Sequence, residues 1–290
     1  MSANIEDNEL SRGLLPMLKL MPQIEKCKDD VVDLVFEGRE FFTPLFVLSF
    51  IVFCVKCGKI VQVHNLPSYL QTIKFKELGL QPDELRGSEF IALMQKYLTK
   101  TYIPIINFPA KSEARDSIIS NVEQMIINQS SIPRNISQAL KYIIAESLDN
   151  ISDHSESERG YIFAQVYKQK GYLDLCIADS GITLLGSYKK LENNDISSDI
   201  EAMQAAQKRV SSKNVDGAES RGFGIYTSRR MLVEGMDGQY LMISGNAVYM
   251  LGKGYDNYYS FPSGLRWNGT IIAFRFPLNK PDFDYTKYFE

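Results

Sequence analysis

The segment from Lys141 to Ser155 predicts an amphipathic helix with a carboxylate and a carboxamide on one polar face. Five side chains recur at helical spacing and mark the buried side: Ile143, Ile144, Ser147, Leu148 and Ile151. Glu146, Asn150 and Asp153 share the polar face. Because Glu146 and Asn150 lie one helical turn apart, they can reach one bound group. The carboxylate can accept a proton from water, and the amide oxygen can ligate a hard cation such as Mg²⁺. The alternative is a solvated face without a ligand, which most surface helices have.

The composition is that of a globular protein and excludes several function classes. The chain has 290 residues, of which 44% are hydrophobic and 23% charged, enough for two domains with separate cores. A net charge of −3 gives no basic excess, so we expect no nucleic-acid partner and no polybasic membrane anchor. The longest apolar run, Pro44 to Val55, is too short to span a membrane. The N-terminus lacks the features of a signal peptide, and we therefore expect a cytoplasmic protein.

The sequence of the first hundred residues predicts a leader followed by a small α/β domain. Residues 1–28 are charged and mostly without periodicity, so we expect a flexible or docking leader. Strands and helices then alternate in the domain at 29–100, with predicted elements at 31–36, 42–57, 60–64 and 68–75. This order favours a parallel sheet with helices packed on it.

Four cysteines are too few and too scattered for a disulfide framework. Cys54 and Cys57 form a C-x-x-C pair, but no second pair with zinc spacing follows. The chain has only two histidines, His64 and His154. We therefore favour buried thiols over a redox or metal site at this pair.

For the domain at 101–290 the sequence predicts helices first and then mostly strands. The helices are expected at 112–128 and 135–154, and the strands at 160–167, 172–178, 239–244, 247–251 and 270–276. A long polar stretch at 184–220 interrupts the strands, and such an insert is typical of a mobile lid.

Glycine-containing motifs follow the helix at 141–155 in a fixed order. Asp179 ends a predicted strand, where it offers an acceptor for an exocyclic amine such as adenine N6. Gly181 lets the backbone approach a ring. Gly222 and Gly224 begin a predicted helix, where free amides suit phosphate. Together with Mg²⁺ held by Asn150 and water handled by Glu146, these motifs describe a nucleotide site.

Residues from about 100 to 290 resemble the GHKL ATPase family, which includes histidine-kinase ATPase domains, gyrase B, Hsp90, MutL and anti-sigma-factor kinases. The matching motifs are Glu146-Ser147-Leu148-Asp149-Asn150 with Asp153-His154-Ser155, Asp179-Ser180-Gly181-Ile182, Gly222-Phe223-Gly224-Ile225 and Gly269-Thr270. The resemblance implies an α+β fold, a Bergerat-type sandwich with a mainly antiparallel sheet and helices on one face. It implies ATP and Mg²⁺ as ligands, Glu146 as general base, Asn150 as Mg²⁺ ligand and Asp179 as the adenine-recognising carboxylate.

This chain departs from the family pattern at the start of the lid. The family's motif continues to a second glycine two positions after Gly181, and Thr183 replaces it here, which is expected to stiffen the hinge. His154 is either a phosphate or lid contact or a plain histidine at a helix end. Arg221 and Lys213 are candidates to meet a γ-phosphate, although lid cations are more often solvated.

Residues 30–80 resemble a STAS domain, the fold of anti-sigma-factor antagonists. Phe42-Thr43-Pro44-Leu45 stands where those proteins carry a phosphorylated serine, and Thr43 is the only hydroxyl there. This departure favours a structural or partner-docking module over a phosphorylation switch.

The two resemblances together imply an ATP-binding regulatory protein that couples binding or slow hydrolysis to a protein partner. One alternative is a serine/threonine kinase of the anti-sigma-factor type, and another is a nucleotide-gated binding module without catalysis. Because many relatives dimerise, a homodimer also stays open.

Overall fold

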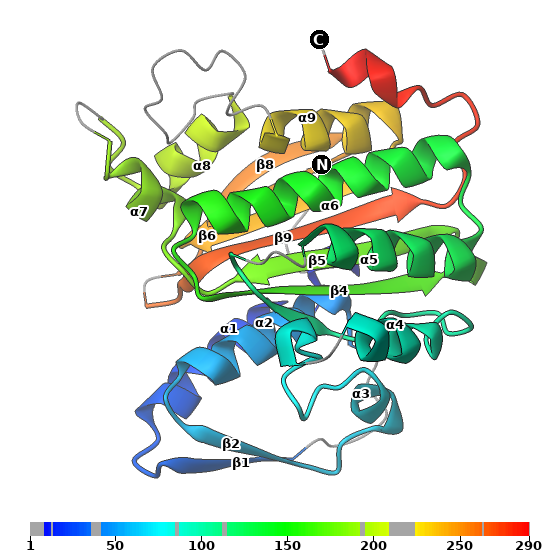
Figure 1. Cartoon of the computed structure of the whole chain (residues 1–290). Coiled ribbons are helices and arrows are strands. Elements are labelled where there is room, and N and C mark those ends of the chain that lie inside the picture. Colours follow the sequence, from blue (N-terminus) through cyan, green and yellow to red (C-terminus); the bar gives the residue numbers. More distant parts are fainter. Residues whose placement is uncertain are drawn as a thin grey trace.

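Seven antiparallel strands form the central sheet of the computed structural model (Figure 1). Their order across the sheet is β3 (Ile106–Pro109), β4 (Arg159–Tyr167), β5 (Tyr172–Asp179), β9 (Trp267–Pro277), β6 (Gln239–Gly245), β7 (Ala247–Gly252) and β8 (Tyr255–Ser260). The structure describes residues 9–12, 14–35, 42–84, 87–111, 115–191, 195–208, 224–262 and 264–289. The α+β class and the antiparallel sheet expected from the sequence are confirmed.

Helices that follow β3 in the chain cover one face of this sheet (Figure 1). They are α5 (Arg115–Ser130), α6 (Arg134–His154), α7 (Leu184–Tyr188), α8 (Asp199–Gln207) and α9 (Gly224–Arg230), which continues as a π-helical turn at Met231–Gly235. The apolar stripe of α6 is buried as the spacing predicts. Its one hydroxyl within the predicted stripe, Ser147, donates to the Ile143 carbonyl at 2.7 Å, so the buried side leaves no polar group unpaired there.

Residues 31–64 contain a parallel βαβ unit. β1 (Val31–Val35) pairs with β2 (Ile60–His64), and α2 (Pro44–Lys56) crosses between them. Thr43 caps α2 by accepting a hydrogen bond from the Phe46 N–H at 3.3 Å. The Thr43 hydroxyl is also buried and donates to the Arg12 carbonyl. In this structure the Thr43 hydroxyl is therefore part of the helix cap.

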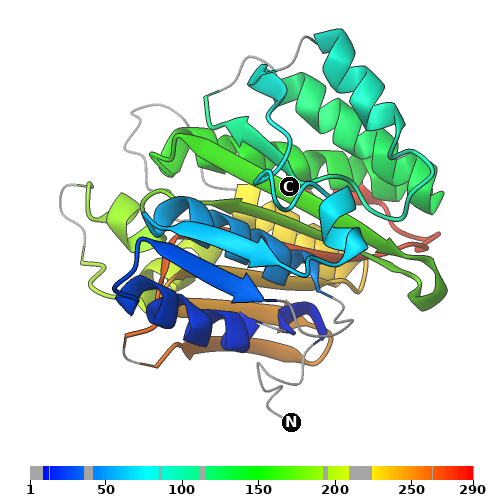
Figure 2. The same cartoon turned by 90° about the horizontal axis from the view of Figure 1, so that it is seen from below.

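Helix α2 packs on the second face of the large sheet, against β4, β5 and β9. The sequence predicts helices on one face, whereas the structure has them on both. The reason is the composition of α2, which has nine buried residues and no continuous polar side. Buried residues from Leu10 to Phe283 consequently form one continuous apolar cluster. Figure 2 shows the N-terminal unit lying across the sheet from below.

Three elements differ from the sequence prediction. Residues expected to form a leader contain α1 (Leu14–Lys26), whose Leu14, Met17 and Leu18 are buried. Strand β8 was not predicted, because polar and apolar residues do not alternate cleanly in its sequence, YDNYYS. The short α7 lies in the stretch expected to be a lid. Two further helices, α3 (Ser68–Thr72) and α4 (Gly87–Gln95), link the two sheets.

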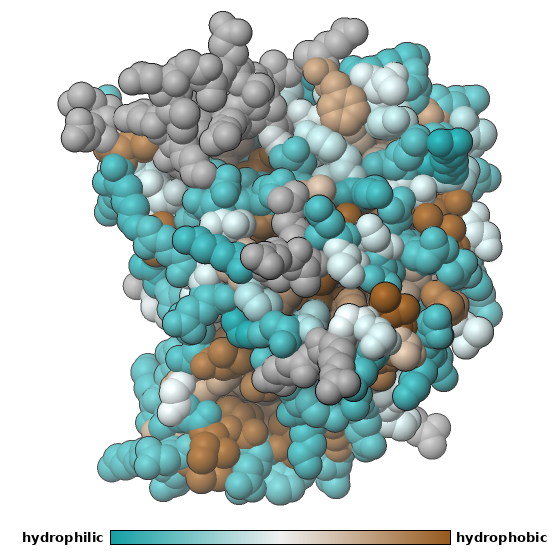
Figure 3. Space-filling view, viewed as in Figure 1, coloured by the Kyte–Doolittle hydropathy of each residue, from teal (hydrophilic) through white to brown (hydrophobic). Residues whose placement is uncertain are grey.

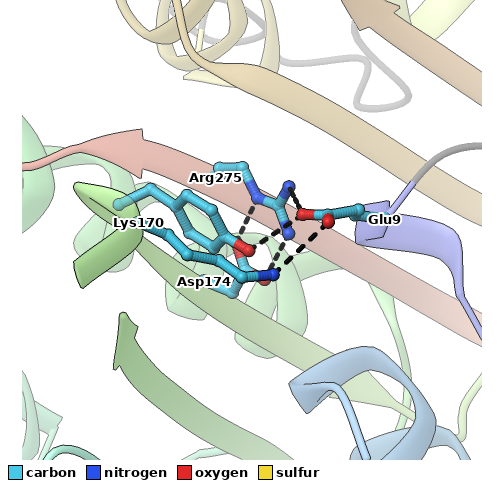
Figure 4. Close-up of polar contacts among 5 residues, drawn as sticks. Glu9, Lys170, Asp174 and Arg275 are labelled. Carbon is cyan, nitrogen blue, oxygen red and sulfur yellow. Dashed lines mark hydrogen bonds and ion pairs between the residues drawn. The ribbon is translucent and has the colours of Figure 1, made fainter. Parts of the chain in front are cut away.

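A cluster of charged side chains holds the N-terminal turn at Glu9–Ser11 on the large sheet (Figure 4). Glu9 contacts Arg275 at 3.3 Å and Lys170 at 3.3 Å, and it accepts a hydrogen bond from the Tyr172 hydroxyl at 3.0 Å. These contacts lower the pKa of Glu9, with the Tyr172 hydrogen bond as the largest cause. The first described residues are thus docked.

None of the helices in the described part of the chain combines the length and the apolar character that a membrane crossing needs.

Candidate functional site

Asp179 ends β5 as a buried carboxyl surrounded by glycine backbone. Its side chain is only 3% exposed, and its Oδ1 accepts the Gly181 N–H at 2.8 Å. Gly269 adopts a φ of +98°, and a β-carbon there would lie 2.8 Å from the same oxygen. Glycine is therefore required at position 269 both by the backbone conformation and by the close approach of β5.

Burial is the main electrostatic influence on Asp179. It raises the pKa of this carboxyl to about 7, while the backbone N–H groups of Gly181 and Thr270 and the charge of Lys56 act in the opposite direction. Lys56 ends α2, so the N-terminal unit contributes to the field at the site. Such a carboxyl can accept a further hydrogen bond from a ligand N–H while it keeps its hydrogen bonds from the two backbone N–H groups.

Gly181 allows α6 to dock against the segment after β5. The Ile182 N–H donates to the Ser155 carbonyl at 2.6 Å, and a β-carbon on Gly181 would overlap that carbonyl. The sequence assigns Gly181 to a ligand ring, and that role stays a prediction. In this structure the closely approaching group is the C-terminal end of α6.

A buried serine on β6 ties the remaining segments of the site together. The Ser244 hydroxyl accepts the Leu184 N–H at 2.9 Å, donates to the Gly269 carbonyl at 2.9 Å and lies 3.3 Å from the Thr270 hydroxyl. Thr183 caps the adjacent α7 by accepting the Gly186 N–H at 3.1 Å. Sequence reasoning did not find Ser244, and a serine in an otherwise apolar strand was the available signal.

Glu146 lies on the face of α6 that meets α9. A β-carbon on Gly224 would overlap its Oε2 atom, so only glycine lets the carboxylate rest there. The Tyr142 hydroxyl, one turn earlier on α6, makes hydrogen-bonding contact with Glu146 and Thr227. Burial first, and then Glu146, raise the pKa of Tyr142. Tyr142 is a second residue that the motifs do not reveal.

The remaining predicted residues fall into three groups. Asn150 is half-buried one turn after Glu146, Asp153 is exposed, and His154 is the last residue of α6. Ile225 packs against the apolar core. Lys213, Arg221, Gly222 and Phe223 lie outside the described residues, as do residues 192–194 and 209–220 of the predicted lid.

The structure thus brings together two sets of predicted residues. Asp179, Gly181, Thr183, Gly269 and Thr270 meet at one end of α6, and Glu146 meets Gly224 further along the same helix. Nine positions of helix between Glu146 and Ser155 correspond to about 13 Å.

In the described part of the chain, no three His, Cys, Asp or Glu side chains are grouped so as to hold a metal ion. A Mg²⁺ ion bound mainly through phosphates and water needs only one or two protein oxygens, so Asn150 fits the predicted role. Cys54 and Cys57 are free thiols, and the Cys57 thiol donates to the Cys54 carbonyl at 3.4 Å. Burial raises the pKa of Cys54 to about 12, which makes its thiolate scarce near neutral pH.

No protein-family model matches this chain, and no curated protein or solved structure is significantly similar to it. The GHKL and STAS resemblances therefore stay predictions.

Proposed function

We propose that this chain binds Mg-ATP along α6 and couples binding or slow hydrolysis to a protein partner. The observation that carries the proposal is the position of two contacts along α6. Glu146 on α6 lies against Gly224 of α9, and the C-terminal end of α6 docks beside Asp179. About 13 Å of α6 separates Glu146 from the helix end near Asp179, and an extended nucleotide can lie along this length.

The adenine end of the nucleotide is assigned to Asp179. Its buried carboxyl is held by backbone N–H groups on both sides, so its orientation is fixed before a ligand arrives. A hydrogen bond from an exocyclic amine to this buried carboxyl favours rings that carry the amine, because a carboxyl oxygen lone pair that the backbone does not use would otherwise stay without a donor. We therefore expect adenine nucleotides to bind more tightly than guanine nucleotides.

The phosphate end is assigned to Asn150 and Glu146. Asn150 offers an amide oxygen for Mg²⁺, and the ion supplies neutralisation of phosphate charge when it is bound. Glu146 orients or deprotonates the attacking water, with the Tyr142 hydroxyl positioning its carboxylate. Thr183 caps α7 and thus fixes where this helix begins after Asp179. A rigid segment at this place is consistent with slow exchange of nucleotide.

The binding claim is tested by calorimetry with ATP, ADP and a non-hydrolysable analogue, each with and without Mg²⁺. We expect Mg²⁺-dependent heat for the wild-type chain and weaker binding for Asp179→Asn. Glu9→Gln, at an exposed position remote from the site, serves as the matched control and is expected to bind as wild type. If none of the three nucleotides gives heat with the wild-type chain, the proposal is wrong.

The fate of bound ATP is tested separately. Hydrolysis predicts Mg²⁺-dependent phosphate release from the purified chain alone, which Glu146→Gln abolishes while ATP still binds. Labelled phosphate on a co-purified protein, without release from the chain alone, would instead indicate a kinase. Binding with neither product would indicate a nucleotide switch.

A further inference from the structure

We propose that the outer edge of β2 binds an extended segment of a partner protein as an added strand. The inference concerns the N-terminal βαβ unit and does not depend on nucleotide binding. It is based on the hydrogen-bonding direction of β2 and on an apolar groove that runs along the same edge.

The backbone of β2 points alternate groups toward and away from β1. The Ile60 N–H donates to the Asp30 carbonyl at 2.9 Å, so Ile60 faces β1. Because successive residues of a strand alternate in direction, Gln62 and His64 also face β1, whereas Val61 and Val63 face the outer edge. Among the described residues β2 has no strand neighbour on that side. Two N–H donors and two carbonyl acceptors are thus available to a further strand.

A groove of about 390 Å³ lies along this edge. Its apolar walls come from α2, from β2 and from the chain after α3, and the residues that matter here are Phe50, Cys54, Val61, Val63, Phe75 and Leu78. Figure 3 shows apolar side chains gathered between α2 and β2 in the lower part of the molecule. Val61 and Val63, whose backbone groups point to the outer edge, thus also line the groove.

An extended peptide satisfies both features at once. Its backbone would pair with Val61 and Val63, and every second side chain would enter the groove beneath α2. A small apolar ligand could fill the groove but would leave the strand edge unpaired. Two basic side chains line the groove, His64 and Lys76. His64 is paired with Asp33 at 2.6 Å, so Lys76 is the side chain that selects an acidic residue in the peptide.

The partner segment is thus expected to alternate apolar and polar residues over about six positions, with an acidic residue near one end. The probe for the test is a displayed library of random peptides of about eight residues, selected on the wild-type chain. The tightest peptides are synthesised, and their affinity is measured by fluorescence anisotropy. We expect the selected sequences to show the alternation.

Backbone pairing is tested with N-methylated versions of the best peptide. Methyl groups on one set of alternate amides block pairing with β2, whereas methyl groups on the other set point away from it. We expect one set to weaken binding at least tenfold and the other to change it less than threefold, since each lost hydrogen bond costs about 1 kcal/mol. Equal tolerance of both sets overturns the proposal.

The protein side is tested with Val61→Pro against Val61→Ala. Both variants lose the valine methyl groups, but only proline removes the outward N–H, and it leaves the bonds from Ile60 and Gln62 to β1 intact. We expect Val61→Pro to bind at least tenfold more weakly than Val61→Ala, with unchanged near-ultraviolet circular dichroism. Should Val61→Pro fail to fold, the methylated peptides decide the question alone. The proposal is overturned if no peptide is selected or if the selected peptides bind Val61→Pro as well as Val61→Ala. It is also overturned if the chain dimerises through the same edge with increasing concentration and thereby competes with the peptides.

Discussion

Arg275 and Asp174 form a doubly hydrogen-bonded ion pair between neighbouring strands β9 and β5. The Arg275 Nε donates to Asp174 Oδ1 at 2.7 Å and its Nη2 donates to Oδ2 at 2.8 Å. The two residues are register partners, and the guanidinium also lies 3.8 Å from the centre of the Tyr172 ring. Asp174 is 1% exposed, and burial raises its pKa even though Arg275 acts to lower it. This carboxylate therefore depends on its partner.

We predict that Arg275→Met destabilises the protein by about 3 kcal/mol or more near neutral pH, because it leaves a buried carboxylate unpaired. The loss is expected to shrink in acid, where Asp174 takes up a proton. Urea unfolding at several pH values measures both effects. Glu9→Gln, which alters the exposed part of the same cluster, is expected to cost less than about 1 kcal/mol. Equal losses for the two variants would contradict the prediction.

The raised pKa of Asp179 predicts a pH-dependent stability. A carboxyl whose pKa is about 7 in the folded protein, against 3.8 in a model compound, favours folding most below pH 4 and loses that contribution as pH rises through 7. The free energy of unfolding of Asp179→Asn minus that of wild type should therefore increase from pH 4 to pH 7, by up to roughly 4 kcal/mol. Denaturant unfolding across this range provides the measurement, and a pH-independent difference would show that the carboxyl is not desolvated.

Gly181→Ala is predicted to destabilise the protein by about 2 kcal/mol or more, because its β-carbon would overlap the backbone carbonyl of Ser155. Backbone cannot rotate away as a side chain can. Gly87→Ala is the matched control, since nothing lies within 4 Å of a β-carbon there and its φ is not positive. Thermal unfolding compares the two, and similar midpoints would show that the contact between α6 and the segment after β5 relaxes easily.

Gly224→Ala is predicted to affect activity more than stability. The group that its β-carbon would meet is the end of the Glu146 side chain, which can move, so unfolding should change by no more than about 1 kcal/mol. If the chain hydrolyses ATP, displacement of this carboxylate should lower phosphate release at least tenfold, since a general base contributes about a hundredfold or more. Glu146→Gln sets the baseline, and wild-type turnover in Gly224→Ala would separate Glu146 from catalysis.

Much of the fold follows from local pattern. The spacing predicts α6, and the boundaries of β2 match the prediction because Gly58 and Pro67 flank a short β-branched run. The position of α2 on the second face of the sheet does not follow, since a helix without a polar side can be buried against any apolar surface. Helix α1 was missed because Pro22 interrupts a short apolar segment that gains its stability from packing on α2.

The site was predicted only where a motif carries its own chemistry. Asp179 and Gly269 are recognisable from residue type and position, whereas the roles of Ser244 and Tyr142 arise from tertiary contacts between distant segments. The contact between Gly181 and Ser155 likewise joins the segment after β5 to the C-terminal end of α6, and no local pattern encodes their proximity.

Helix α2 is shared between the groove beside β2 and the underside of β5, the strand that ends in Asp179. A truncated protein that begins near residue 100 would expose the apolar undersides of β4 and β5 to water and is expected to aggregate. For the same reason the parts of the chain before and after residue 100 should melt together, in one calorimetric transition rather than two.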